Sequence, residues 1–213
     1  MKPLGVLLAG GLSRRMGGGD KGLMPLGGKP VMQHAFERLK AQTDGIIINA
    51  NGDPSRFAGF ETTVVPDTIS GFAGPLAGVL AGMRYAEAQD NPPTFIVTAA
   101  ADTPFFPKAL VERFLAEAKT SKTIVLAGSN GRRHPVFGLW PVSLANHLET
   151  WLSDEENRKV LAWVDQHSWA MAEFEEPAFK DQNTDPFFNI NTPEDFAIAE
   201  QLLAENKTTE PTG

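Results

Sequence analysis

Short apolar runs that alternate with longer amphipathic segments are the feature of this chain that most restricts its fold. The runs contain Val, Ile and Leu with few polar residues between them, which is typical of strands buried on both faces of a sheet. Helical segments between strands favour parallel pairing. The sequence therefore predicts an α/β fold with a mainly parallel central sheet, with strands at Leu4–Leu8, Gly45–Asn49, Thr62–Val65, Thr94–Ala99 and Thr123–Ala127.

The segment Gly74–Ala88 has helical periodicity although it contains Gly78 and Gly82. Glycine disfavours a helix interior, but two glycines four residues apart leave a bare ridge that permits close approach of the sheet or of a ligand. The other expected elements are a helix with the apolar stripe Val31, Ala35 and Leu39, a helix from near Pro107, a strand His134–Trp140, short helices Leu144–Leu152 and Val160–Gln166, a final strand Phe187–Ile190, and a last helix capped by Thr192 with Asp195 in the place of the capping-box acid.

Length and composition indicate one domain, expected over residues 1–204 with a flexible polar tail at 205–213. The chain has 213 residues, of which 42% are hydrophobic and 21% charged, an ordinary globular mixture. It contains no cysteine, which excludes disulfides, zinc–thiolate sites and a cysteine nucleophile. A net charge of −7 argues against binding to nucleic acid. No apolar run approaches the roughly 20 residues that span a bilayer, so a soluble, cytoplasmic protein is expected.

The glycines are concentrated at the amino end, where nine of the 20 fall within the first 28 residues. The stretch 13–29 also carries Arg14, Arg15, Lys21 and Lys29 against a single carboxylate, Asp20. Exposed amides and cations without bulky side chains are suited to surround a polyphosphate. The alternative interpretation is a surface turn with solvated charges. The sequence thus favours a phosphate-binding loop after the first strand.

Two common nucleotide loops do not fit this stretch. A Walker loop needs Lys after its second glycine, but Gly27 is followed by Gly28. Gly17, Gly19 and Gly22 match the spacing of the dinucleotide motif, yet they neither follow a strand directly nor lead into a helix.

Four polar or glycine positions follow different expected strands: Gly10, Asn49, Asp67 and Asp102. Ligands of open parallel sheets bind beyond the carboxyl ends of the strands, so these positions are expected to converge. Taken singly, Asn49 and Asp67 could be turn residues, and Asp102 could cap the helix that follows.

The ordered motifs resemble those of the molybdenum cofactor guanylyltransferases. These motifs run from near residue 4 to about residue 200: Leu8-Ala9-Gly10-Gly11-Leu12-Ser13-Arg14-Arg15-Met16-Gly17, Asp20-Lys21, Gly28-Lys29-Pro30, Asn49-Ala50-Asn51, Pro66-Asp67, Gly74-Pro75-Leu76-Ala77-Gly78, Asp102-Thr103-Pro104, His134-Pro135 and Asn189-Ile190-Asn191-Thr192-Pro193-Glu194. The resemblance implies a Rossmann-like three-layer sandwich of the nucleotide-diphospho-sugar transferase type. It also implies transfer of GMP from GTP to the phosphate of Mo-molybdopterin, and the preference for guanine comes from the resemblance alone.

The resemblance assigns GTP to the amino-terminal part of the chain. Leu8, Ala9 and Gly10 would supply backbone contacts, Lys21 would reach the phosphates, Asn49 and Asp67 would contact the nucleoside, and Asp102 would bind both GTP and Mg²⁺. Arg15, Lys21 and Asp102 are the expected catalytic residues.

The carboxyl-terminal part is expected to bind the molybdopterin substrate through Arg133, His134, Asn189 and Asn191. Arginine suits an anionic phosphate and asparagine can read the donors and acceptors of a pterin. A charged hairpin tip and an Asn-rich turn explain the same residues equally well. Family members often carry threonine where this chain has Val136 and cysteine where it has Ala101, and the first departure weakens the assignment of this loop.

No covalent intermediate is expected. Ser129 lies in Gly128-Ser129-Asn130-Gly131, which is not a nucleophile elbow, so a Ser-His-Asp series is excluded on sequence, and the four histidines lack metal-binding spacing. A phosphate monoester is already largely ionised at neutral pH, so it can attack the α-phosphorus in line. The resemblance also implies transient contact with molybdenum insertion proteins and acceptor molybdoenzymes. Two alternatives stay open: a cytidylyl- or sugar-phosphate nucleotidyltransferase on the same fold, and a non-catalytic nucleotide-binding subunit that delivers cofactor.

Overall fold

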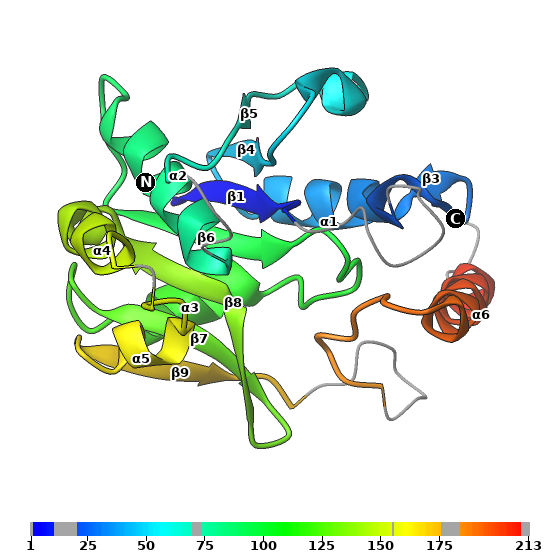
Figure 1. Cartoon of the computed structure of the whole chain (residues 1–213). Helices are drawn as coiled ribbons and strands as arrows, with labels where there is room; N and C mark the ends of the chain where they lie inside the picture. Colours follow the sequence, from blue (N-terminus) through cyan, green and yellow to red (C-terminus); the bar gives the residue numbers. More distant parts are fainter. Residues whose placement is uncertain (1, 11–20, 70–73, 155, 176–183, 210–213) are drawn as a thin grey trace.

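The computed structural model is built around one seven-stranded sheet (Figure 1), and it describes residues 2–10, 21–69, 74–154, 156–175 and 184–209. The strand order is β5-β4-β1-β6-β8-β7-β9. The strands are β1 (Leu4–Leu8), β4 (Gly45–Asn49), β5 (Val64–Val65), β6 (Phe95–Ala100), β7 (Ile124–Ser129), β8 (Arg132–Pro141) and β9 (Trp169–Glu173), and a separate small hairpin joins β2 (Pro25–Leu26) to β3 (Lys29–Pro30).

The sheet is mainly parallel, as the sequence predicts. β1 lies parallel to both β4 and β6, β5 extends the sheet parallel to β4, and β9 lies parallel to β7. The exception is β8, which is antiparallel to β6 and to β7. β7 and β8 form a hairpin whose turn lies at Asn130 and Gly131, both in the left-handed region with φ of 51° and 71°. The hairpin projects beyond the neighbouring parallel strands.

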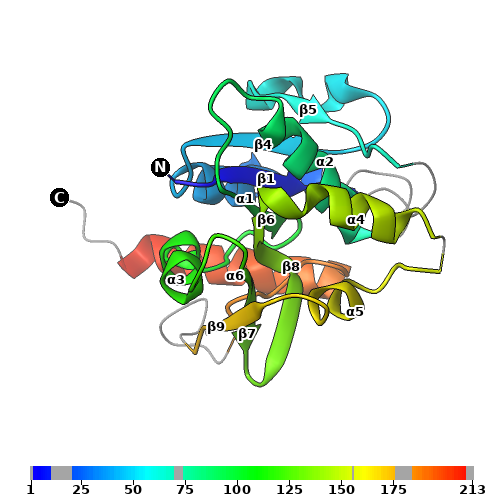
Figure 2. The same ribbon diagram turned by 90° about the vertical axis from the view of Figure 1, so that its left-hand side faces the viewer.

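Helices cover both faces of the sheet and make three layers. α1 (Val31–Lys40) and α3 (Leu110–Glu117) pack on one face, and α2 (Pro75–Glu87), α4 (Ala145–Leu152) and α5 (Val160–Val164) on the other. Figure 2 shows the sheet near edge-on, with α3 on one side and α4 and α5 on the opposite side. Three short 3₁₀ helices lie at Lys21–Leu23, Pro54–Phe60 and Val142–Leu144.

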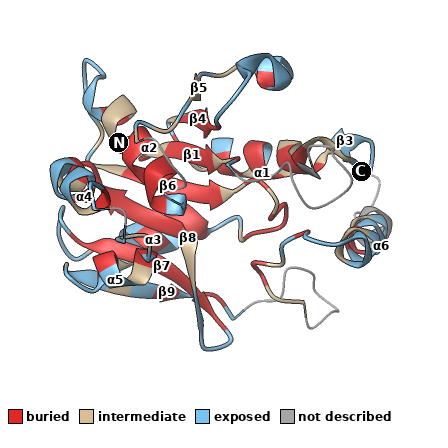
Figure 3. Ribbon diagram, viewed as in Figure 1, coloured by how far each residue is buried: buried red, intermediate tan, exposed pale blue. Residues whose placement is uncertain are grey.

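Alternation along the strands divides the core into two clusters, because successive side chains point to opposite faces. In β1, Leu7 joins the cluster under α1 and α3, whereas Val6 joins the cluster under α2, α4 and α5. In β4, Ile48 and Ile47 divide in the same way. The strands β1, β4, β6 and β7 are therefore largely buried on both faces (Figure 3), which explains their continuous apolar sequences.

A third apolar cluster fastens the last helix, α6 (Pro193–Thr209), to the amino-terminal hairpin. Leu202 is 1% exposed and packs with Leu26 of β2, and Phe105 and Ile190 complete the cluster. The start of α6 has the expected capping box, because Asp195 N–H donates to Thr192 Oγ1 (3.1 Å) and Thr192 N–H donates to Asp195 Oδ2 (2.9 Å). The last helix thus packs against the β2–β3 hairpin, which precedes α1.

The structure differs from the sequence predictions in three elements. Phe187–Ile190 is not a strand; Phe187 and Ile190 are buried, but the segment pairs with no strand and Ile190 N–H makes one backbone bond, to Asp102 O (2.8 Å). The edge strand β9 was not expected, since Trp169 and Met171 are each 37% exposed and its apolar pattern is weak. α6 continues to Thr209, past residue 204 where the tail was expected to start.

The described helices include none that combines the length and the apolar character needed to cross a membrane.

Candidate active site

A cleft lies beyond the carboxyl ends of the parallel strands β1, β4 and β6. Its volume is about 1060 Å³. Its walls come from both halves of the chain, because the β7–β8 hairpin and the segment before α6 face the strand ends. The expected site residues that line it are Leu8, Gly10, Asn49, Asp67, Asp102, Arg133, His134, Asn189 and Asn191.

Three side chains after β4 and β5 form a hydrogen-bonded network on the amino-terminal side of the cleft. Asn49 Nδ2 donates to Asp67 Oδ1 (2.9 Å) and to Val65 O (3.1 Å). Asn51 Nδ2 donates to Asp67 Oδ2 (2.7 Å), and Asp67 N–H donates to Asn51 Oδ1 (2.9 Å). Asn49 is only 3% exposed. These residues are therefore more than turn formers, and each amide fixes one oxygen of Asp67.

Gly78 of α2 makes room for Asn49. A Cβ at this position would lie 2.3 Å from Asn49 Oδ1 and 2.6 Å from Leu8 Cδ2. Gly82, one turn later, faces the core instead, and its Cβ would lie 2.7 Å from Val6 Cγ2. The glycine ridge thus serves tight packing of α2 on the sheet along its whole length, and at Gly78 it also borders the cleft.

The three positions expected to give backbone contacts to GTP differ in what they offer. Ala9 is 6% exposed, and its N–H donates to Asn49 O (2.9 Å). The carbonyl of Leu8 accepts from Ala101 N–H (3.1 Å), although Leu8 lines the cleft. Gly10 is exposed and lines the cleft, and no atom of the described residues would lie within 4 Å of a Cβ there. Gly10 is the position where a ligand can approach the backbone most closely.

Asp102 follows β6 and lines the middle of the cleft. It is not a helix cap, because α3 begins at Leu110. Its Oδ1 accepts from Thr103 Oγ1 (3.2 Å), and its carbonyl accepts from Ile190 N–H, which ties the segment before α6 to β6. The described residues hold no group of three or more metal-ligating side chains. Mg²⁺ usually binds one or two carboxylates together with phosphate oxygens and water, so the carboxylate of Asp102, which lines the cleft, fits this ion.

Two expected catalytic groups cannot be placed. Arg15 lies outside the described residues, and so does the side chain of Lys21, whose backbone starts the first 3₁₀ helix.

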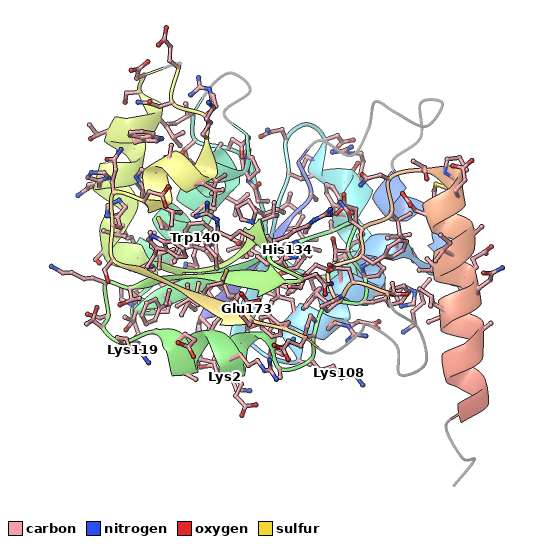
Figure 4. The ribbon with its side chains drawn as sticks, turned by 90° about the horizontal axis from the view of Figure 1, so that it is seen from below. Lys2, Lys108, Lys119, His134, Trp140 and Glu173 are labelled. Carbon is pink, nitrogen blue, oxygen red and sulfur yellow. The ribbon has the colours of Figure 1, made fainter. Side chains whose placement is uncertain are left out.

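His134 lies on the hairpin side of the cleft with two partners that the sequence analysis did not connect to it. Ser129 Oγ lies 2.7 Å from His134 Nε2, and it lies 3.0 Å and 2.9 Å from the two carboxylate oxygens of Asp185. The ring of Phe187 stacks on His134 with centroids 4.5 Å apart. In Figure 4, His134 lies between Trp140 and α6. The sequence analysis excluded a Ser-His-Asp series, but these three side chains do lie close together, because Ser129 contacts Asp185, which is 56 positions away in the chain.

The pKa values in this group follow from burial and charge. Burial lowers the pKa of His134 and Arg132 adds to this, whereas Asp185 and Glu173 oppose it. Burial acts to raise the pKa of Asp185, but the Phe187 N–H and the side chains of Ser129 and Asn130, together with His134, lower it overall. At neutral pH the group thus contains a carboxylate and a neutral imidazole.

Asn189 and Asn191 lie on either side of the buried Ile190, and both are exposed to the cleft. Arg133 also lines the cleft, with its guanidinium 3.6 Å from Asp165 Oδ1 and over the ring of Trp169 (5.4 Å to the centroid). The structure brings these three residues and His134 to one wall, opposite Asn49 and Asp67.

Sequence reasoning passed over Asn51 and Asp185 as site residues. Asn51 belongs to the motif Asn49-Ala50-Asn51. Its two-residue spacing from Asn49 was the signal that both side-chain amides can reach the same carboxylate. Asp185 precedes the apolar run Pro186-Phe187-Phe188, and a carboxylate beside such a run was the only local signal. Its partner Ser129 lies in a distant hairpin, which no local pattern shows.

The fold and the cleft are those of an α/β nucleotidyltransferase, with the ligand site at the carboxyl ends of the strands. The model of the MobA-like NTP transferase domain matches residues 5–169, and the chain belongs to this family. It is 47% identical to a molybdenum cofactor guanylyltransferase of Mesorhizobium japonicum, over 93% of this chain and 95% of that protein, and 44% identical to one of Rhizobium meliloti, over 98% and 95%. The crystal structure of molybdopterin-guanine dinucleotide biosynthesis protein A from Archaeoglobus fulgidus has the same fold, with a TM-score of 0.71 at 22% identity over 95% of this chain and 99% of that one.

Proposed function

We propose that this protein is a guanylyltransferase that transfers GMP from GTP to the phosphate of Mo-molybdopterin, giving molybdopterin guanine dinucleotide and pyrophosphate. The observation that carries this proposal is the cleft of about 1060 Å³, which is lined by Asn49 and Asp67 on one wall, by His134, Asn189 and Asn191 on another, and by Asp102 between them. Two substrates that must meet at one phosphorus need such a two-sided site. Relatives 44–47% identical over nearly the whole chain carry the name of this activity.

The two walls suit two substrates. Beside Asp67, the exposed backbone of Gly10 admits a nucleoside close to the strand ends. The opposite wall offers the amides of Asn189 and Asn191, which can both donate and accept, as a pterin requires. Asp102 lies between the walls, at the place where the triphosphate and the acceptor phosphate would meet.

The reaction needs alignment and charge compensation more than acid–base chemistry. The acceptor phosphate is largely ionised at neutral pH. Its oxygen forms the new bond to the α-phosphorus while the bond to the bridging oxygen breaks, and pyrophosphate leaves with that electron pair. Holding both groups in line supplies much of the rate acceleration. Arg15 and Lys21 would offset the charge that develops on the phosphates.

Asp102 would hold Mg²⁺, which when bound neutralises part of the triphosphate charge. The carboxylate of Asp102 also accepts a hydrogen bond from the Thr103 hydroxyl, and both residues line the cleft.

Incubation of the protein with Mg²⁺, Mo-molybdopterin and each of the four nucleoside triphosphates in turn, with pyrophosphate measured, tests the proposal. Pyrophosphate is expected with GTP only, and only when Mo-molybdopterin is present. Product from CTP or from a sugar phosphate, with GTP inert, would replace the proposal by a cytidylyl- or sugar-phosphate nucleotidyltransferase. Binding of GTP without any turnover would point to a cofactor-delivery subunit.

Asp102→Asn is expected to reduce turnover by about 10²-fold or more, because it removes the negative charge that would bind Mg²⁺ and keeps the shape of the side chain. The melting temperature should stay within about 2 °C of the wild-type value, which corresponds to less than about 1 kcal/mol in a chain of this size. Asp90→Asn changes an exposed carboxylate after α2 and serves as the matched control. Wild-type turnover in Asp102→Asn would refute the metal assignment.

A further inference from the structure

Ser129, His134 and Asp185 form a continuous hydrogen-bonded chain whose proton positions can be deduced. The carboxylate of Asp185 accepts from Phe187 N–H (2.8 Å) and from Asn130 Nδ2 (3.2 Å), in addition to its contact with Ser129 Oγ. An ionised carboxylate can only accept, so the single hydroxyl proton of Ser129 belongs to Asp185. The Ser129 oxygen is then left as an acceptor toward His134. The proton between Ser129 Oγ and His134 Nε2 must therefore reside on Nε2.

This arrangement is not that of a nucleophilic triad. In a triad the carboxylate bonds to the far nitrogen of the histidine, and the serine proton faces the histidine. Here His134 Nε2 lies 3.9 Å from Asp185 Oδ1, and Ser129 stands between them. Ser129 is also fully buried, with 0% exposure, so no substrate can reach its oxygen. The chain of bonds serves to orient the imidazole.

With its proton on Nε2, a neutral His134 presents Nδ1 as a bare acceptor. Among the described residues no hydrogen bond engages Nδ1, and His134 lines the cleft beside Asn189. The stacked ring of Phe187 restricts rotation of the imidazole. Asp185 also fixes the start of the segment that carries Asn189 and Asn191, since it holds Phe187 N–H.

We propose that Ser129 and Asp185 are positioning residues that hold His134 in its Nε2–H form, so that Nδ1 accepts a hydrogen bond from an N–H group of the pterin-type second substrate. This inference rests on the proposed function for the identity of that substrate. The charged groups that face His134 are Asp185 from the segment before α6, Arg132 from its own strand and Glu173 from β9. They are mixed in sign, and the imidazole is neutral at the pH of the tests below.

The first test measures the proton position directly. In protein labelled with ¹⁵N-histidine at pH 8, the ring nitrogens of His134, identified by comparison with His134→Gln, are expected to show protonated Nε2 and bare Nδ1. Ser129→Ala should allow both tautomers, because Asp185 is too far from Nε2 to replace the lost hydroxyl. Asp185→Asn, which keeps size and can still accept from Phe187 N–H, should raise the Nδ1–H population. A dominant Nδ1–H form in the wild type, or an unchanged tautomer in both variants, would overturn the inference.

The second test separates the two substrates. Ser129→Ala and Asp185→Asn are expected to raise the KM for Mo-molybdopterin about tenfold, the loss of roughly one oriented hydrogen bond, while the KM for GTP changes less than about twofold. Thr43→Ala is the matched control, since its buried hydroxyl donates to Leu39 O (3.0 Å) at the opposite end of β1 from the cleft. Equal changes in both KM values, or none, would contradict a role specific to the second substrate.

The first test fails independently of the proposed function, whereas the second test requires an active wild type. A wild-type protein that forms no product from GTP and Mo-molybdopterin would remove the proposed function, whereas the tautomer of His134 is measured without any substrate. An active wild type whose His134 carries its proton on Nδ1 would remove only the positioning role.

Discussion

At the scale of single residues, the site depends on where side chains are absent as much as on where they are present. Gly78 lies directly beneath the Asn49 amide, and Asn49 in turn holds Asp67. A methyl group at position 78 would overlap Asn49 Oδ1 and the Leu8 side chain. Close packing of α2 at Gly78 therefore fixes the position of the Asn49–Asp67 pair, although α2 contributes no functional side chain there.

Gly78→Ala is expected to weaken GTP binding about tenfold or more and to destabilise the fold by about 1–3 kcal/mol, the usual cost of overpacking. Gly82→Ala is the matched control, because its Cβ meets Val6 and Ile96 in the core and not the cleft. It should cost similar stability and leave the Kd for GTP nearly unchanged. Calorimetric titration with GTP and urea unfolding measure the two effects. Equal loss of GTP affinity in both variants would show that Gly78 acts only through stability.

The sequence predicts site residues best where a polar residue directly follows a buried strand. Asn49, Asp67 and Asp102 all line the cleft for this reason, because parallel strands end at one edge. Asp185 follows no strand, and its role depends on contact with a hairpin 56 positions away. Local spacing carries no information about such a contact. The same limit explains why Ser129 was interpreted only by its neighbours in sequence.

At the scale of elements, burial on both faces made the strands predictable. The expected Leu4–Leu8 and Gly45–Asn49 agree with β1 and β4 at both ends. β9 was missed because an edge strand needs no continuous apolar run. Phe187–Ile190 was mistaken for a strand because Phe187 packs against Phe137 of β8 and Ile190 packs against α6, without pairing to a strand. Apolar patterning reports burial, and it indicates a strand only where hydrogen-bonding partners are available.

α6 is the element that holds the second wall of the cleft in place. Leu202 packs against β2 and the cluster that includes Ile190, whose neighbours Asn189 and Asn191 line the cleft. Leu202→Ala is expected to cost about 2–5 kcal/mol where the cavity cannot collapse, and to raise the KM for Mo-molybdopterin more than that for GTP. Ile198→Ala, at a position 41% exposed on the same helix, should change neither. Thermal unfolding and steady-state kinetics measure both, and a larger effect on the KM for GTP would show that α6 supports the other wall.

At the scale of the whole molecule, stability against acid is expected to depend on two partly buried histidines, His134 and His167. The pKa of His167, which follows α5, is lowered by burial and by the nearby His147. Its Nε2 atom is buried and has no hydrogen-bond partner among the residues that the structure describes. The pKa of His134 is lowered mainly by burial as well. A histidine whose pKa is lower in the folded state binds fewer protons there than in the unfolded chain. Both residues therefore make the folded state lose stability as the pH falls.

The window of this loss begins near pH 6.5, the ordinary pKa of histidine in the unfolded chain, and extends down to the lowered values in the folded state. Asp185, whose pKa is lowered, contributes only below its unfolded value of about 3.9, outside this window.

His167→Phe keeps an aromatic ring against Trp163, whose ring centroid lies 4.6 Å from that of His167, and removes the titrating group. The free energy of unfolding in urea should therefore fall less between pH 8 and pH 5 in His167→Phe than in the wild type. The pH dependence of the free energy of unfolding that remains in His167→Phe should decrease again when His134→Gln is added. Equal pH dependence in the wild type and His167→Phe would mean that His167 is protonated as readily in the folded protein as in the unfolded chain, and would contradict the lowered pKa of His167.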